Sequence, residues 1–125
     1  MTIEELIAFA QRVGARVYFL PLTGLNGALS VEGDILINAR LTQAAQRVTL
    51  AHEIGHLVKG HDWNVRHDKA RDERQADIFA SSLLVKAEDY EEIEKIFDGC
   101  QASIAKELGV TPTLLELWRE HHFPA

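Results

Sequence analysis

The residues with the clearest capacity for chemistry form a His-Glu-x-x-His pattern, His52-Glu53-Ile54-Gly55-His56, within an apolar run. In a helix, at about 100° per residue, a four-residue step leaves His52 and His56 only about 40° apart, so both imidazoles can reach one metal ion. Apolar side chains occupy the other side of the same helix: Leu50, Ile54, Leu57 and Val58. The alternative is a core helix that carries two histidines by chance, and the separation of the two faces argues against it.

A catalytic zinc ion usually has three protein ligands and keeps one position for water, so a third ligand is expected elsewhere in the chain. A second helical pattern follows downstream, with Glu73 and Asp77 one turn apart on one face. Glu73 can ligate the metal, and Asp77 can accept the free ring N–H of a ligand histidine, which fixes its tautomer. The alternative is that both carboxylates are solvated charges on a helix surface.

These two motifs together resemble the ImmA/IrrE family of small metallopeptidases, within the wider gluzincin-like plan. The resemblance rests on His52-Glu53-Ile54-Gly55-His56 followed by Glu73-x-x-Ala76-Asp77-x-Phe79-Ala80-x-x-Leu83-Leu84, and the family layout covers nearly the whole chain. One departure is visible, because Val85-Lys86 stands where the family often has Met-Pro.

The resemblance implies a zinc-binding enzyme. It assigns His52, His56 and Glu73 as ligands of one Zn²⁺ per chain and Glu53 as general base. It also implies a partner, a helix-turn-helix repressor or an antitoxin-like regulator that the protein cuts or disarms. The residues themselves leave manganese and iron open as the native metal.

The elements that must position these residues are predicted as an α+β, zincin-like fold. We expect an N-terminal helix capped by Thr2 and Glu5, then a metal-binding helix that begins after Thr42. Between them lie β-favouring runs at 16–20, 28–31 and 34–38 with a turn at 32–34, which predict a small, mostly antiparallel three-stranded sheet. The Glu73 helix and the C-terminal helices complete a single domain over residues 1–125.

The polar segment between the two metal-bearing helices, residues 61–69, has no helical or strand period and is predicted as a loop near the site. Its histidines, His61 and His67, could hydrogen-bond a developing oxyanion or a substrate. The simpler interpretation is that both are exposed loop residues.

The C-terminal segment 101–122 has a helix-turn-helix pattern, with Thr111 as N-cap and Pro112 at the first helical position. A DNA-reading helix normally supplies donors to phosphates and bases, whereas this one carries Glu116 and Glu120 with Arg119 as its only permanent cation. Direct DNA binding is therefore disfavoured, and the segment is expected to pack on the rest of the domain.

Composition limits the partners further. The 125 residues carry 19 acidic and 13 basic side chains, a net charge of -6, which disfavours nonspecific attraction to nucleic acid or anionic membrane. A single cysteine, Cys100, excludes an intramolecular disulfide and agrees with a reducing cytosol. The N-terminus lacks a signal-peptide pattern and no run reaches membrane-spanning length, so we expect a cytoplasmic protein without membrane contact.

The sequence thus predicts a zinc-dependent endopeptidase acting on a protein substrate, with an extended substrate pairing along the strand near 34–40. The competing hypothesis is a non-catalytic antirepressor that binds its repressor partner and uses zinc only for folding. Glu53 separates the two hypotheses, since a structural site needs no base.

Overall fold

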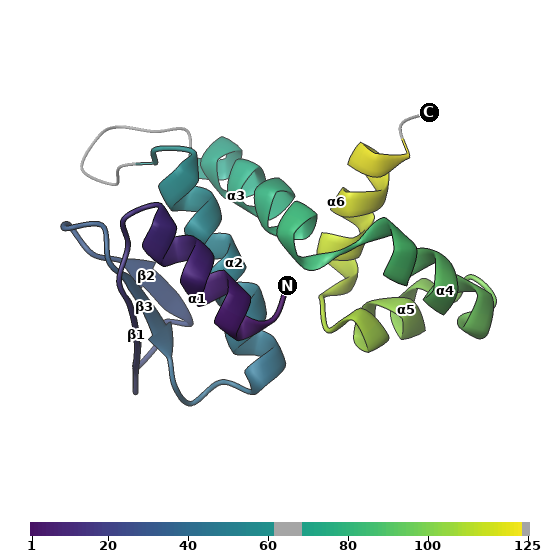
Figure 1. Ribbon diagram of the computed structural model, residues 1–125, viewed down its shortest axis with the longest axis horizontal. Coiled ribbons are helices and arrows are strands. Elements are labelled where there is room, and N and C mark those ends of the chain that lie inside the picture. The colour runs from purple at the N-terminus through teal and green to yellow at the C-terminus, as the bar shows by residue number, and fades with distance from the viewer. Residues whose placement is uncertain (62–68, 124–125) are drawn as a thin grey trace.

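A computed structural model describes residues 1–61 and 69–123, and within these ranges the chain forms six helices and one three-stranded sheet. The architecture is α+β, as the sequence predicted (Figure 1). The elements in chain order are α1 (Ile3–Arg12), β1 (Val17–Leu20), β2 (Gly27–Leu29), β3 (Ile35–Asn38), α2 (Gln43–Val58), α3 (Lys69–Leu84), α4 (Ala87–Phe97), α5 (Gln101–Leu108) and α6 (Pro112–His122).

Side-chain caps start three of the helices where the sequence predicted them. Thr2 accepts a hydrogen bond from the Glu5 N–H, and the Glu5 carboxylate accepts one from the Thr2 N–H, both at 3.1 Å. Thr42 caps α2 and Thr111 caps α6 in the same way, each through a hydroxyl that accepts from the N–H three residues later. Because each cap satisfies an N–H that the first helical turn leaves without a partner, the helix begins there.

The sheet has the order β1-β3-β2, so β3 is the central strand. The β2–β3 hairpin is antiparallel, as predicted, whereas β1 runs parallel to β3, which makes the sheet mixed rather than mostly antiparallel. The β2–β3 hairpin places β3 next to β1, so β2 lies at the edge of the sheet opposite β1. One expectation is therefore wrong: the strand near 34–40 cannot pair with a substrate, because both of its edges are already hydrogen-bonded.

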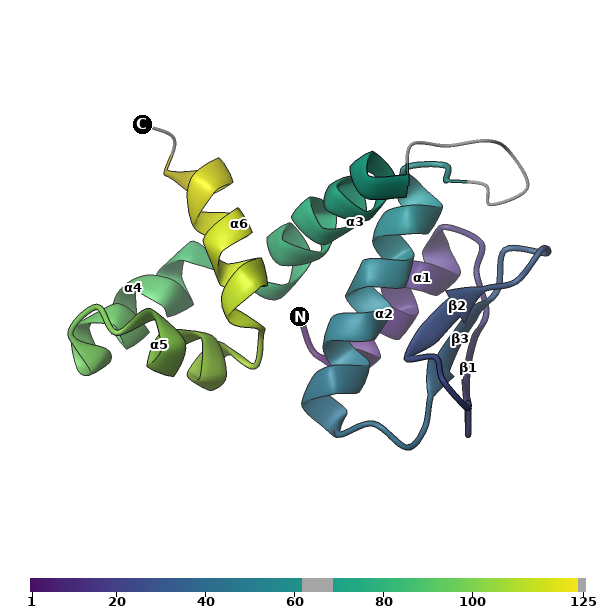
Figure 2. The ribbon, with the colours of Figure 1, turned by 180° about the vertical axis from the view of Figure 1, so that it is seen from behind.

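Helices α1 and α2 cover one face of this sheet (Figure 2). Ile35 and Ile37 of β3 point into that face and are fully buried, while Tyr18 and Leu20 of β1 point to the opposite face and are exposed. Alternation along the strands thus fixes which face carries α2, the helix that bears the histidines.

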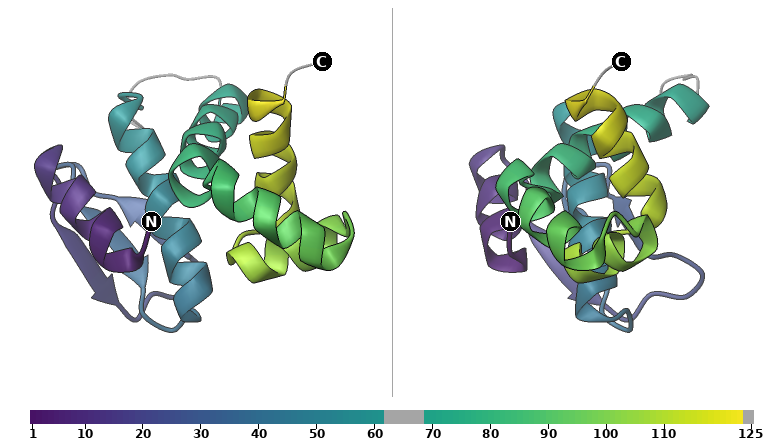
Figure 3. Two further views of the ribbon diagram at one scale, coloured as in Figure 1. Left: turned by 45° about the vertical axis from the view of Figure 1, so that its right-hand side comes forward. Right: turned by 90° about the vertical axis from the view of Figure 1, so that its right-hand side faces the viewer.

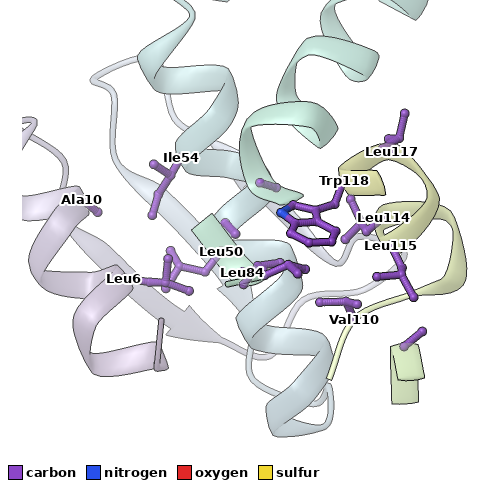
Figure 4. Close-up of a cluster of buried hydrophobic side chains, with 14 of the residues drawn as sticks. Leu6, Ala10, Leu50, Ile54, Leu84, Val110, Leu114, Leu115, Leu117 and Trp118 are labelled. Carbon is purple, nitrogen blue, oxygen red and sulfur yellow. The ribbon is translucent and has the colours of Figure 1, made fainter. Parts of the chain in front are cut away.

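Helix α3 packs along α2, and α6 packs against α3 on the side away from the sheet (Figure 3). The buried apolar residues form one cluster, in which Leu6 of α1 and Leu50 and Ile54 of α2 lie on one side (Figure 4). Leu84 at the end of α3 and Trp118 of α6 continue the same cluster on the other side. Nowhere in the described ranges is a helix both long and apolar enough to span a bilayer.

Candidate metal centre

Helix α2 carries both histidines toward the same point. Leu50, Ala51 and Ile54 are fully buried on its other side, so the apolar face sets the rotation of the helix. The four-residue step then places the His52 and His56 rings edge to face, with centroids 4.6 Å apart. Their Nε2 atoms are 3.0 Å from each other.

Helix α3 supplies the third group. The two carboxylate oxygens of Glu73 lie 3.0 Å from His52 Nε2 and 3.2 Å from His56 Nε2. One ligand atom from each of these three residues falls within 4.8 Å of the other two. The structure therefore brings together, from two helices, the three residues that the sequence indicated as ligands.

Asp77, one helical turn after Glu73, lies behind His52. Its Oδ1 is 2.7 Å from His52 Nδ1, and an ionised carboxylate can only accept, so Nδ1 carries the proton and Nε2 presents its lone pair. Burial lowers the pKa of His52, but the hydrogen bond and charge of Asp77, together with the charges of Glu53 and Glu73, outweigh burial and raise this pKa above its ordinary value. For His56, burial and the neighbouring His52 lower the pKa.

The donor set fits a divalent metal ion. Lone pairs on two imidazole nitrogens and a carboxylate that meet at one point repel one another unless a cation lies between them. Two nitrogens and one carboxylate, with one ring oriented by a second carboxylate, match the chemistry of catalytic zinc sites.

Glu53 lies next to this cluster and is buried, with 8 % of its surface exposed. Burial raises its pKa to about 7, with the charge of Glu73 acting in the same direction and that of His52 opposing it. Gly27 of β2 packs directly on it, because a Cβ added to Gly27 would lie 3.4 Å from Glu53 Cγ and 2.6 Å from Thr49 Cγ2. Strand β2 thus forms the wall against which the Glu53 side chain rests.

A cleft of about 560 Å³ opens beside these residues. His52, Glu53, Glu73 and Asp77 line it together with residues of three other regions: Gly24, Leu25, Asn26 and Gly27 before and in β2, Val48 and Thr49 of α2, and Thr111, Thr113 and Leu114 at the start of α6. The sequence did not indicate Gly27 or the start of α6 as parts of the site. No local signal could have found them, since a glycine at the start of a strand and a helix N-cap have the same sequence pattern whether or not they are near a site.

His61 lies on the side of His56 away from Glu73, and His67 lies outside the described residues. His61 Nδ1 is 2.8 Å from His56 Nδ1, whereas the cleft and Glu73 are on the Nε2 side of that ring. The His61 side chain is only 10 % exposed, so it is neither a free surface residue nor turned toward the cleft.

Comparison with known proteins agrees with this geometry. Residues 10–117 match the family described as the IrrE N-terminal-like domain, Peptidase_M78. Among curated proteins, none matches the sequence.

Proposed function

Since the chain belongs to the Peptidase_M78 family of IrrE N-terminal-like domains, a metallopeptidase family, we propose that it is a zinc-dependent endopeptidase acting on a protein substrate. The observation that carries this proposal is Glu53, a buried carboxyl group that lines the same cleft as His52 and Glu73. A site that only stabilises the fold has no need of a base in this position.

One zinc ion per chain would be held by His52 Nε2, His56 Nε2 and the Glu73 carboxylate. The chemistry that zinc supplies in such sites is polarisation of the scissile carbonyl and acidification of a water molecule. Asp77 keeps the Nε2 lone pair of His52 directed at this point.

Glu53 acts as the general base. Its carboxylate accepts one proton as the water oxygen bonds to the carbonyl carbon, and then delivers that proton to the amide nitrogen as the C–N bond breaks. In the metal-free protein burial raises the pKa of this carboxyl group to about 7, which makes it a stronger proton acceptor than an ordinary carboxylate. Gly27 supports the role by limiting the positions open to the Glu53 side chain.

The substrate segment pairs with β2 in an extended conformation. Among the strands of the described residues, β2 is an edge strand that pairs with β3, and it begins at Gly27, beside Glu53. Strand addition along this edge would carry a peptide bond past the base, with main-chain hydrogen bonds providing affinity. This arrangement requires an unfolded or mobile segment in the target protein.

The partner we propose is a DNA-binding repressor or antitoxin-like regulator. A net charge of -6 favours a partner with a basic surface, as DNA-binding proteins have. Direct DNA binding by this chain is disfavoured further by α6, which buries Leu114, Leu115, Leu117 and Trp118 and leaves Glu116 and Glu120 exposed.

Glu53→Gln tests the proposal. The amide keeps the size and hydrogen bonding of the side chain but removes the base, so zinc content, fold and partner binding should persist while cleavage is lost. Wild type, Glu53→Gln and the ligand variant His52→Ala would be incubated with candidate repressors, and fragments, complexes and bound zinc measured. Cleavage by wild type alone supports the peptidase. Equal disarming of the repressor by wild type and Glu53→Gln, without fragments, would leave the non-catalytic antirepressor in its place.

A further inference from the structure

We infer that His61 is a positioning residue for His56, holding this ligand in the ring form and orientation that metal binding needs. The inference rests on the proposed zinc site. It assigns to His61 a different role from the oxyanion or substrate contact that its place in the sequence suggested.

The backbone brings His61 to this position directly after α2. The His61 N–H donates to the His56 carbonyl at 3.0 Å, so the chain folds back at the end of the helix. The two rings then lie edge to face, with centroids 5.1 Å apart and the Nδ1 atoms at 2.8 Å.

Two residues of α3 lie behind His61. Gln75 Oε1 is 2.8 Å from His61 Nε2, and Asp72 Oδ1 is 3.4 Å from the same nitrogen. The side chains of His61 and Asp72 are 10 % and 8 % exposed, so the contact between these two is shielded from water, whereas Gln75 is exposed.

The acceptors on α3 determine the direction of the hydrogen bonds between α3, His61 and His56. The amide oxygen of Gln75 and an ionised Asp72 can both only accept, so His61 Nε2 carries a hydrogen. A neutral imidazole has one N–H, so His61 Nδ1 is an acceptor and His56 Nδ1 must be the donor. The lone pair of His56 is then on Nε2, the atom that lies 3.0 Å from His52 Nε2 and 3.2 Å from Glu73.

The two ligand histidines are therefore oriented by two different sets of hydrogen bonds to the same helix, α3. Asp77 of α3 contacts His52 directly, whereas Asp72 and Gln75 of α3 act on His56 through His61. Glu73, the third proposed ligand, follows Asp72 and precedes Gln75 and Asp77 on the same helix. Loss of such a hydrogen-bond partner typically weakens metal binding by roughly 10- to 100-fold.

The experiment measures zinc affinity by competition with a chelating dye, with circular dichroism to verify the fold. His61→Phe keeps a ring but removes both nitrogens, and should weaken zinc binding by about 10- to 100-fold, as should Asp77→Ala. His61→Asn places an amide oxygen where Nδ1 was, and should restore most of the affinity. His121→Phe, a histidine substitution at the C-terminal end of α6, is the matched control and should leave the affinity unchanged.

The ring form of His56 can also be measured directly, without zinc. Long-range proton–nitrogen NMR spectra of the metal-free protein should identify His56 as the Nδ1–H form in wild type and lose that preference in His61→Phe. Unchanged zinc affinity in His61→Phe would overturn the inference, and so would equal losses in His61→Phe and His61→Asn, which would point to packing alone.

The outcome is separable from that of the proposed function, because no cleavage is measured. Zinc binding that is lost in His52→Ala but unchanged in His61→Phe overturns only the role of His61. A wild-type protein that binds no zinc overturns both.

Discussion

At the scale of single residues, the site depends on which atoms carry protons. Asp77 makes His52 Nδ1 a donor and so leaves Nε2 for a metal ion. Burial favours the neutral form of the Glu53 carboxyl group and raises its pKa to about 7. Two acidic side chains near one centre thus have different surroundings: Asp77 contacts the Nδ1 of His52, whereas Glu53 is the group that exchanges a proton in the proposed mechanism.

The raised pKa of Glu53 predicts a pH-dependent stability in the metal-free protein. The folded state binds this proton more tightly than the unfolded state, whose carboxyl has the ordinary value of 4.5. The stabilisation is therefore complete below pH 4.5 and is lost as pH rises through about 7. Glu53→Gln should not show this loss, so above neutral pH it should exceed wild type in unfolding free energy by about 3 kcal/mol.

Urea unfolding across this pH range, with a chelator present, checks the prediction. Glu4→Gln changes an exposed carboxyl group and controls for the loss of one negative charge. A constant difference between Glu53→Gln and wild type at every pH would show that the Glu53 carboxyl is not perturbed by its surroundings.

At the scale of elements, the distance between Glu73 and the two histidines depends on how closely α3 packs against α2. Gly55 of α2 packs on the backbone of Ala76 in α3: an added Cβ would lie 2.6 Å from the Ala76 carbonyl oxygen and 2.9 Å from its Cα. Gly55 lies between the two histidines in the sequence, and Ala76 lies between Glu73 and Asp77. The two helices are therefore in close backbone contact at the level of the proposed ligands.

Gly55→Ala should destabilise the protein and weaken zinc binding together. Alanine in a helix interior is favoured over glycine by about 1 kcal/mol, but overpacking costs typically about 1–3 kcal/mol, and the atoms in the way are backbone atoms that cannot rotate aside. We expect a net loss of up to about 2 kcal/mol and a zinc affinity at least about tenfold lower, because Glu73 moves away from the histidines.

Chemical unfolding and dye competition measure the two effects. The double variant Gly55→Ala with Ala76→Gly should not recover either property, since the crowded atoms belong to the Ala76 backbone and not to its methyl group. A Gly55→Ala protein more stable than wild type would mean that α2 and α3 are not in such close contact.

At the scale of the whole molecule, Arg47 of α2 joins three distant parts of the chain. Its guanidinium donates to the carbonyls of Met1 at 2.6 Å, Leu84 at 3.0 Å and Leu108 at 3.3 Å. Leu84 and Leu108 are the last residues of α3 and α5, whose terminal carbonyls have no partner within their own helices. Arg47 therefore holds the C-terminal half against the helix that carries the histidines.

Arg47→Lys should cost about 1–3 kcal/mol of unfolding free energy, although the charge is kept, because one ammonium group cannot reach carbonyls at three places. Thermal and urea unfolding measure the change. Arg119→Lys, at an exposed position of α6, is the matched control and should stay within about 0.5 kcal/mol of wild type. Equal stability of Arg47→Lys and wild type would show that the three hydrogen bonds do not matter for folding.

Helix positions and their chemical faces could be predicted from the sequence, because both depend on neighbours within about four residues. Thr2, Thr42 and Thr111 begin helices through hydrogen bonds to residues three positions on, and the spacing of His52 and His56 alone places them on one face. The α+β class and the family followed from such local patterns combined along the chain.

Strand order, edges and partners across the site were decided only in the tertiary structure. Periodicity within β1 and β3 contains no information on which strand is central, so it could not predict the parallel β1–β3 pair or the position of β2 at the end of the strand order. The same holds for Gly27 beside Glu53 and for His61 between His56 and Asp72. These contacts join residues whose separation in the sequence carries no periodic signal, and they form because packing of the buried faces brings β2, α2 and α3 to one place.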